Sequence, residues 1–141
     1  MGGLFVCCVL LQIHAADLDW GTDLPKALAQ AKTEKKMVFL DFTGSDWCPG
    51  CILFHDQVAA SPKFASYAKT NLVLVEVDFP NKKPQSDALK AANDILQKKY
   101  DIEGFPTFIL LDMDGKQLAR QTGYAPDSAD AFMAGLEKLG K

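Results

Sequence analysis

The sequence predicts an α/β fold in which a mixed β-sheet is covered by helices on both faces. Three short runs have the apolar composition of buried strands: Met37–Phe42, Leu72–Val77 and Thr107–Leu111. Helix-like patterns separate these runs, and a turn at Asp112–Gly115 joins the last run to Lys116–Thr122 as a hairpin. Because strands that alternate with helices pair in parallel and a hairpin is antiparallel, the sheet should be mixed.

Three helices are predicted before the second strand. The first begins after Thr22 or Asp23, since either side chain can cap a helix whose first turn tolerates Pro25. The next begins at a Cys-x-x-Cys pair. Ser61 followed by Pro62 is a fresh N-cap with proline at the first helical position, so this segment should be two consecutive helices and not one.

Two more helices are predicted in the second half of the chain. Pro126–Leu139 forms the last one, and Ser86–Lys99 forms the one before it. Apolar residues at helical spacing predict the inner face of the Ser86–Lys99 helix, namely Ala88, Leu89, Ala92, Ile95 and Leu96.

Length and charge exclude several classes of protein. A chain of 141 residues has room for one domain and one core. A net charge of −3 leaves no basic surface that would favour nucleic acid as a partner. We expect a monomer that needs no cofactor and no resident metal.

The N-terminus resembles a secretory signal. The apolar run Leu4–Ile13 is too short to cross a bilayer, and small residues and then acidic ones follow it. This predicts cleavage after Ala15 or Ala16, with residues 1–16 as the signal and residues 17–141 as the domain. No Lys or Arg precedes the run, so a buried N-terminal strand is the alternative.

The pair Cys48 and Cys51 is the most informative motif. It follows a strand-like run and a short loop, and it stands where a helix begins. Free amides at a helix N-terminus stabilise a thiolate, so two thiols at this position are placed for redox chemistry. A structural disulfide and half of a zinc site are the alternatives.

Three motifs together resemble the thioredoxin superfamily. They stand in the order in which that family has them, and the likeness extends from about Trp20 to the C-terminus. The motifs are Asp41-Phe42, then Trp47-Cys48-Pro49-Gly50-Cys51, then Gly104-Phe105-Pro106-Thr107.

The resemblance implies a thiol–disulfide oxidoreductase. In that family Cys48 would be the exposed thiol that attacks a client disulfide, and Cys51 the buried thiol that resolves the mixed disulfide. Phe105 and Pro106 would form a cis-proline loop that faces the cysteines and holds the client chain. Asp41 would be a buried carboxyl that exchanges a proton with Cys51.

Residues beside the cysteines indicate the direction of the reaction. Trp47 would shield the disulfide and offer an apolar contact to clients, and Pro49 and Gly50 would lie at the same client-binding surface. Because neither Pro49 nor Gly50 carries a positive charge that would stabilise a thiolate, a reductase is favoured over an oxidase.

The chain departs from the family pattern at three places. The loop Thr43–Asp46 is one residue longer than in typical thioredoxins. Leu74 stands where the family has a lysine, and His55 stands where it has a proline. Cys48, Cys51 and His55 could therefore form part of a metal site, although a half-buried helix histidine is the favoured interpretation.

The sequence thus predicts an enzyme that reduces or isomerises disulfides of exported bacterial proteins, in the periplasm or outside the cell. Its partners would be disulfide-bearing clients and, by analogy, a membrane thiol-transfer protein that supplies electrons. The alternatives are a metal-binding or metal-chaperone module that uses Cys48, Cys51 and His55, and a thioredoxin-like module that only binds.

Overall fold

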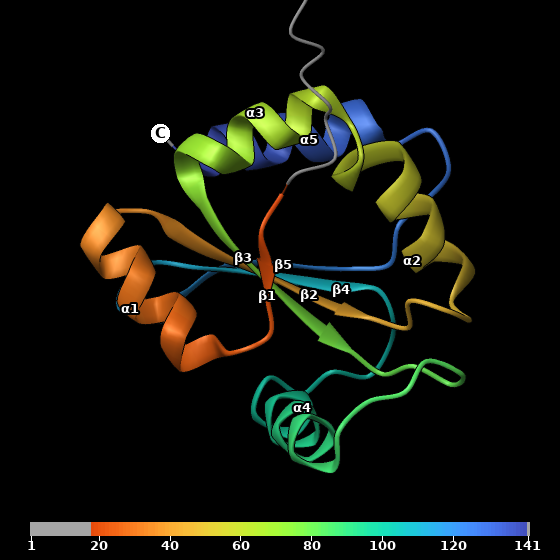
Figure 1. The fold of residues 1–141 in the computed structure, drawn as a ribbon. Coiled ribbons are helices and arrows are strands. Elements are labelled where there is room, and N and C mark those ends of the chain that lie inside the picture. The colour runs from red at the N-terminus through yellow and green to blue at the C-terminus, as the bar shows by residue number, and fades with distance from the viewer. Residues whose placement is uncertain (1–17, 141) are drawn as a thin grey trace, which may run out of the picture.

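A five-stranded sheet forms the centre of the protein in the computed structural model, which describes residues 18–140 (Figure 1). The strands lie in the order β1-β3-β2-β4-β5. Strand β3 pairs in parallel with β1 and β2, whereas β4 is antiparallel to both β2 and β5. The predicted mixed sheet is confirmed. Its strands are β1 (Trp20–Gly21), β2 (Met37–Thr43), β3 (Leu72–Asp78), β4 (Thr107–Leu111) and β5 (Gln117–Thr122).

Helices cover both faces of this sheet (Figure 1). One face packs against α1 (Leu24–Glu34) and the region of α4 (Asp87–Lys99). The other face packs against α2 (Pro49–Phe54), α3 (Pro62–Asn71) and α5 (Ala129–Leu139). A single π-helical turn, η1 (His55–Ala59), continues α2 before the chain turns into α3.

Three of the predicted helix starts are confirmed by their caps, whereas the last helix begins at Ala129 and not at Pro126. The side chain of Asp23 accepts a hydrogen bond from the backbone of α1, with Lys26 N at 3.0 Å. Ser61 caps α3 and Ser86 caps α4 in the same way. Each cap satisfies an amide that the helix itself leaves without a partner, so it fixes where the helix begins.

The predicted inner face of α4 is wrong in part. Ala88 and Ala92 are exposed, and Ile95 is 65% exposed. The buried residue of this helix is Asn93, whose Nδ2 donates a hydrogen bond to the backbone oxygen of Asp78 at 2.9 Å. This bond fixes the rotation of α4, and the apolar stripe consequently borders an open groove instead of the core.

Aromatic packing holds α2 on the sheet. Phe54, at the end of α2, is 1% exposed, and its ring centroid lies 4.3 Å from that of Phe108 on β4 and 5.1 Å from that of Phe132 on α5. Phe39 on β2 stacks on Phe108 with centroids 5.8 Å apart. The same face of the sheet therefore determines where the Cys-x-x-Cys segment stands.

The predicted signal segment, residues 1–16, lies outside the described residues. Within residues 18–140, no helix is both long enough and apolar enough to span a membrane.

Candidate active site

Cys48 and Cys51 form a disulfide at the start of α2. Their Cα atoms are 5.2 Å apart, and Cys48 is the N-cap residue of the helix. Two backbone amides reach the sulfur atoms: Cys51 N donates to Cys48 Sγ at 3.3 Å, and Gly44 N donates to Cys51 Sγ at 3.4 Å. The strand–loop–helix arrangement therefore directs free amides at both sulfurs.

The expected difference in exposure between the cysteines is wrong for this disulfide form. Cys48 is 5% exposed and Cys51 is 3% exposed. In a disulfide each sulfur covers the other, so exposure does not separate the two thiols here. Their positions do separate them, because Cys48 caps the helix whereas Cys51 lines a cavity beneath it.

The Phe105–Pro106 peptide bond is cis, and this loop lies against Gly50, which stands between the two cysteines. A Cβ atom added at Gly50 would stand 3.3 Å from Pro106 Cδ. The backbone oxygen of Pro106 accepts a hydrogen bond from Gly123 N at 2.7 Å, which ties the loop to the end of β5. The structure thus brings together Gly50 and Pro106 from segments more than fifty residues apart.

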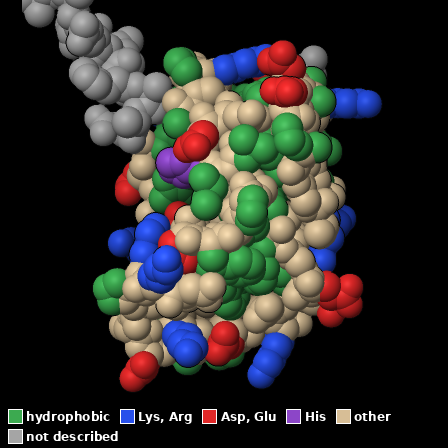
Figure 2. Space-filling model, turned by 90° about the vertical axis from the view of Figure 1, so that its right-hand side faces the viewer, with side chains coloured by type: hydrophobic (Ala, Val, Ile, Leu, Met, Phe, Trp, Pro, Cys, Tyr) green, Lys and Arg blue, Asp and Glu red, His purple; other side chains and the backbone are tan. Residues whose placement is uncertain are grey.

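Apolar side chains gather on the face of the molecule that carries the cysteines (Figure 2). Trp47 is 42% exposed, and its ring meets the Phe105 ring edge-on with centroids 5.8 Å apart. Its Nε1 donates to the backbone oxygen of Phe79 at 2.7 Å. A Cβ atom at Gly44 would overlap the Trp47 ring, so the longer loop needs glycine there.

Asp46 is a structural residue of the site that the sequence did not reveal. Its carboxylate accepts hydrogen bonds from three consecutive backbone amides, those of Asn81, Lys82 and Lys83, at 2.7–2.9 Å. These bonds lower the pKa of Asp46 to about 2. The carboxylate thereby fastens the loop after β3 to the loop before Cys48, and its partners lie 35 or more residues away in sequence.

A polar cavity of about 170 Å³ lies beneath the disulfide. Asp41 on β2 lies at this cavity and is only 8% exposed, and its Oδ1 has no hydrogen-bond partner within the described residues. Burial raises the pKa of Asp41 to about 8, with further contributions from the nearby carboxylates of Glu76 and Asp78. The cavity is lined by Asp41, Thr43, Ser45, Cys51, Ile52, His55, Glu76 and Lys83.

Glu76 is a second carboxyl residue that sequence reasoning missed. In the register of β2 and β3 it is the direct partner of Asp41, whereas Leu74 is the partner of Phe39. Leu74 therefore belongs to the apolar core, and a carboxyl group stands beside Asp41. Strand alternation puts the Glu76 side chain on one face of β3, but only the register between β2 and β3 shows which residue lies beside it.

The expected half-buried His55 is wrong. Its side chain is 70% exposed and lies 3.6 Å from the carboxylate of Asp56. The π-helical turn that starts at His55 buries Val58 and Ala59 and leaves His55 outside. Within residues 18–140, no group of three or more His, Cys, Asp or Glu side chains could hold a metal ion.

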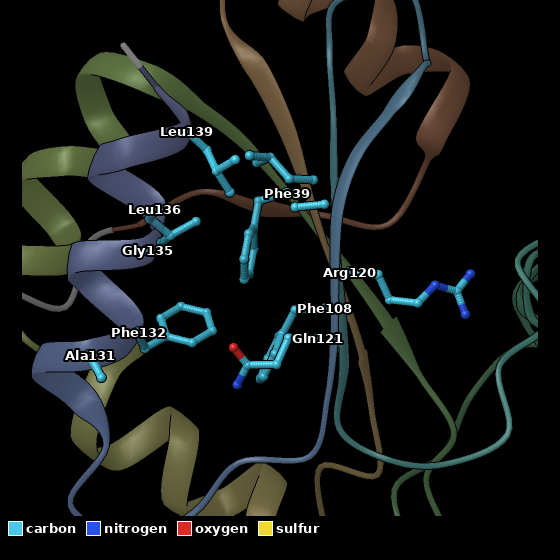
Figure 3. Close-up of a pocket in the computed structure, with 11 residues that line it drawn as sticks. Phe39, Phe108, Arg120, Gln121, Ala131, Phe132, Gly135, Leu136 and Leu139 are labelled. Atoms are coloured by element: carbon cyan, nitrogen blue, oxygen red, sulfur yellow. The ribbon is translucent and has the colours of Figure 1, made fainter.

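A second cavity, of about 180 Å³, lies between α5 and the sheet, and the cysteine site does not contribute to it (Figure 3). Its walls are mainly apolar, with Phe39, Phe108 and Phe132 around it, and the Arg120 side chain points away from these rings (Figure 3). It offers no group for acid–base or thiol chemistry, so the chemical site is the one at the cysteines.

We predict that Asp41→Asn stabilises the protein at neutral and alkaline pH. Because the pKa of Asp41 is raised in the folded protein, Asp41 is protonated in the folded state but ionised in the unfolded chain between about pH 4 and pH 8. The carboxyl group therefore lowers the free energy of unfolding, and this loss grows as pH rises through this window. Urea unfolding should show a gain on the order of 2–4 kcal/mol at pH 7 and little gain at pH 4. An equal gain at both pH values would contradict this account, and the exposed Asp19→Asn is the control.

We predict that Asp46→Asn releases the loop after β3. The low pKa of Asp46 means that its bonds stabilise the fold above about pH 4 and are lost as pH falls toward about 2. In the wild type, the amide signals of Asn81, Lys82 and Lys83 should titrate together in that range by NMR. In the variant, their hydrogen exchange at pH 7 should be faster. Unchanged exchange in the variant would show that the carboxylate does not hold the loop.

Comparison with known proteins places the chain in a family. Residues 24–140 match the model of the Thioredoxin-like domain. The disulfide bond reductase DsbH of Chlamydia pneumoniae is 40% identical over 122 residues, which are 86% of this chain and 72% of that protein. The thiol:disulfide interchange protein DsbD of Cronobacter sakazakii is 35% identical over 116 residues, which are 81% of this chain and 18% of that protein.

A solved structure agrees with these sequence relatives. A structure described as DsbH oxidoreductase superimposes with a TM-score of 0.80 at 38% identity, covering 91% of this chain and 88% of that one. Fold, motif order and cysteine geometry lead to one conclusion: the chain belongs to the thioredoxin-like family.

Proposed function

We propose that the protein is a thiol–disulfide oxidoreductase that reduces, or isomerises, disulfides of exported proteins through Cys48 and Cys51. The observation that carries the proposal is the Cys48–Cys51 disulfide at the N-cap of α2, next to the Pro106 loop. The names of the relatives, disulfide bond reductase and thiol:disulfide interchange protein, support the same activity.

Cys48 is the attacking thiol in this proposal. As the N-cap residue it faces the amide of Cys51, which donates to Sγ and favours the thiolate in the reduced protein. The thiolate attacks a client disulfide, a bond forms between Cys48 and one client sulfur, and the other client sulfur leaves as a thiolate. Cys51 then attacks Cys48 Sγ and releases the client's second thiol.

Asp41 handles the proton of Cys51. A thiol must lose its proton before it attacks, and the cavity that Asp41 shares with Cys51 is polar and large enough to admit water. Because burial raises the pKa of Asp41 to about 8, close to that of a thiol, a proton can move between the two groups in either direction.

Clients dock on the apolar surface around Cys48. The exposed ring of Trp47 and the partly buried ring of Phe105 lie there, and Pro106 borders the helix start. Exposed Pro49 and the bare backbone of Gly50 leave room for a client chain to approach the sulfur of Cys48. The backbone beside Pro106 would hold that chain in an extended conformation.

We further propose that the protein works outside the cytoplasm and receives electrons from a membrane thiol-transfer protein. The signal-like run Leu4–Ile13 supports export. A reductase in an oxidising compartment needs such a donor. The match to DsbD covers 18% of that protein, which is consistent with a resemblance to one domain of a thiol-transfer protein.

We predict that the protein reduces insulin with dithiothreitol as electron source. Cys48→Ser should abolish turnover, because the variant lacks the attacking thiol. Cys51→Ser should instead accumulate mixed disulfides with the client, visible by mass spectrometry. An inactive wild type, or mixed disulfides formed by Cys48→Ser in place of Cys51→Ser, would overturn the assignment. A cobalt titration that yields thiolate charge-transfer bands would favour the metal-binding alternative instead.

We predict a reduction potential nearer to the ≈ −270 mV of thioredoxin than to the ≈ −120 mV of DsbA. Neither residue between the cysteines carries a charge that would stabilise the reduced, thiolate-bearing state. Equilibration with glutathione buffers, followed by mass spectrometry of alkylated protein, measures this potential. A value above about −150 mV would reverse the preference for a reductase.

A further inference from the structure

Two carboxyl groups stand side by side beneath the disulfide. Asp41 on β2 and Glu76 on β3 are direct partners in the parallel register, so their side chains leave the sheet on the same face. That face also carries Phe39 and Leu74, which belong to the core beneath α2 and α3. The pair is therefore on the side of the sheet where the cysteine helix lies.

Both carboxyl groups line the cavity that reaches Cys51. Asp41 is the more deeply buried of the two, and its Oδ1 lacks a partner among residues 18–140. Glu76 is half-buried, and no Lys, Arg or His nitrogen lies within 4 Å of its carboxylate in this part of the chain. Neither group is neutralised by a close ion pair.

Besides Asp41, three charged or titratable groups act on Glu76: one from its own strand and two from other segments. Asp78 lies on the same strand, but Ser45 holds its carboxylate through two hydrogen bonds, with N at 3.0 Å and Oγ at 2.5 Å. Lys83 lies in the loop after β3 and donates to Ser45 Oγ at 3.2 Å. His55 lies on η1. Burial and Asp78 raise the pKa of Glu76, whereas Lys83 and His55 lower it.

We propose that Glu76 is a positioning residue of the redox site, whose carboxylate adds to the effect of burial and keeps a larger fraction of the neighbouring Asp41 protonated above neutral pH in the disulfide form, ready to give its proton to Cys51. Glu76 acts on the cysteines through Asp41 and does not touch the reacting sulfurs. The inference rests on the proposed oxidoreductase function.

The proton and the electrons balance in this scheme. A dithiol donor attacks Cys48 Sγ, the Cys48–Cys51 bond breaks, and its electron pair goes to Cys51 Sγ. Asp41 then gives its proton to that sulfur and becomes a carboxylate beside the carboxylate of Glu76. The repulsion between the two charges favours return of the proton when Cys51 later attacks the mixed disulfide and loses it.

The test compares Glu76→Gln with the wild type in the oxidised protein. Carbon NMR of the Asp41 carboxyl should show its titration midpoint falling by about one pH unit, because a neighbouring negative charge is gone. With a midpoint near 7 in place of about 8, Asp41 would be about one-tenth protonated at pH 8 and not half. Reduction of the disulfide by dithiothreitol should therefore slow about fivefold at pH 8 and stay nearly unchanged at pH 6.

Three further variants make the result specific. Glu137→Gln removes one charge from helix α5 and is the control for a change in net charge. At each pH, the rate of Glu76→Gln is divided by the rate of this control, which removes the effect of the titration of dithiothreitol itself. Glu76→Asp keeps the charge and should keep the Asp41 midpoint near its wild-type value. In an Asp41→Asn background, Glu76→Gln should have no further effect on the pH profile.

An unchanged Asp41 midpoint, a rate loss equal at pH 6 and pH 8, or an effect that persists without Asp41 would each overturn the proposal. The NMR titration needs no client. A protein that fails to reduce insulin but shows the shifted midpoint would thus disprove the proposed function and leave the coupling of the two carboxyl groups standing.

Discussion

The packing of Phe54 on the aromatic face of the sheet is the interaction on which the redox site depends. Helix α2 has only six residues, too few to be stable by itself in water. Its position comes from Phe54, which is wedged between Phe108 and Phe132. Since Cys48 caps the other end of the same short helix, this packing also sets where the sulfur meets the helix amides and the Pro106 loop.

The sheet beneath α2 changes character within one strand. Along β2, Phe39 belongs to the aromatic core, and two residues later the same face carries the buried carboxyl of Asp41. A buried carboxyl without a hydrogen-bond partner lowers stability, and a protein keeps such a group where the chemistry needs it. In the proposed mechanism, the transition from Phe39 to Asp41 therefore marks the border between the part of the sheet that stabilises the fold and the part that serves the cysteines.

Local sequence signals were enough for the framework and for the dithiol, but not for interactions between distant segments. Apolar runs located three central strands, and Asp23, Ser61 and Ser86 marked helix starts, because these signals act within a few residues. The two-residue strand β1 has too little pattern to be found. Glu76 was missed because its neighbour depends on the register between strands, which no local pattern in β3 encodes.

In the proposed function, the close approach of Gly50 and Pro106 links the redox properties of the dithiol to client binding. A larger residue at position 50 would carry a Cβ atom 3.3 Å from Pro106 Cδ, so the loop or the helix start would have to move slightly. A charged residue there would also change the stability of the Cys48 thiolate. Position 50 thus affects both the reduction potential of the cysteine pair and the fit of the Pro106 loop against the helix start. Glycine lets that loop lie close to the helix start and adds no charge beside Cys48, whose sulfur accepts a hydrogen bond from the backbone amide of Cys51.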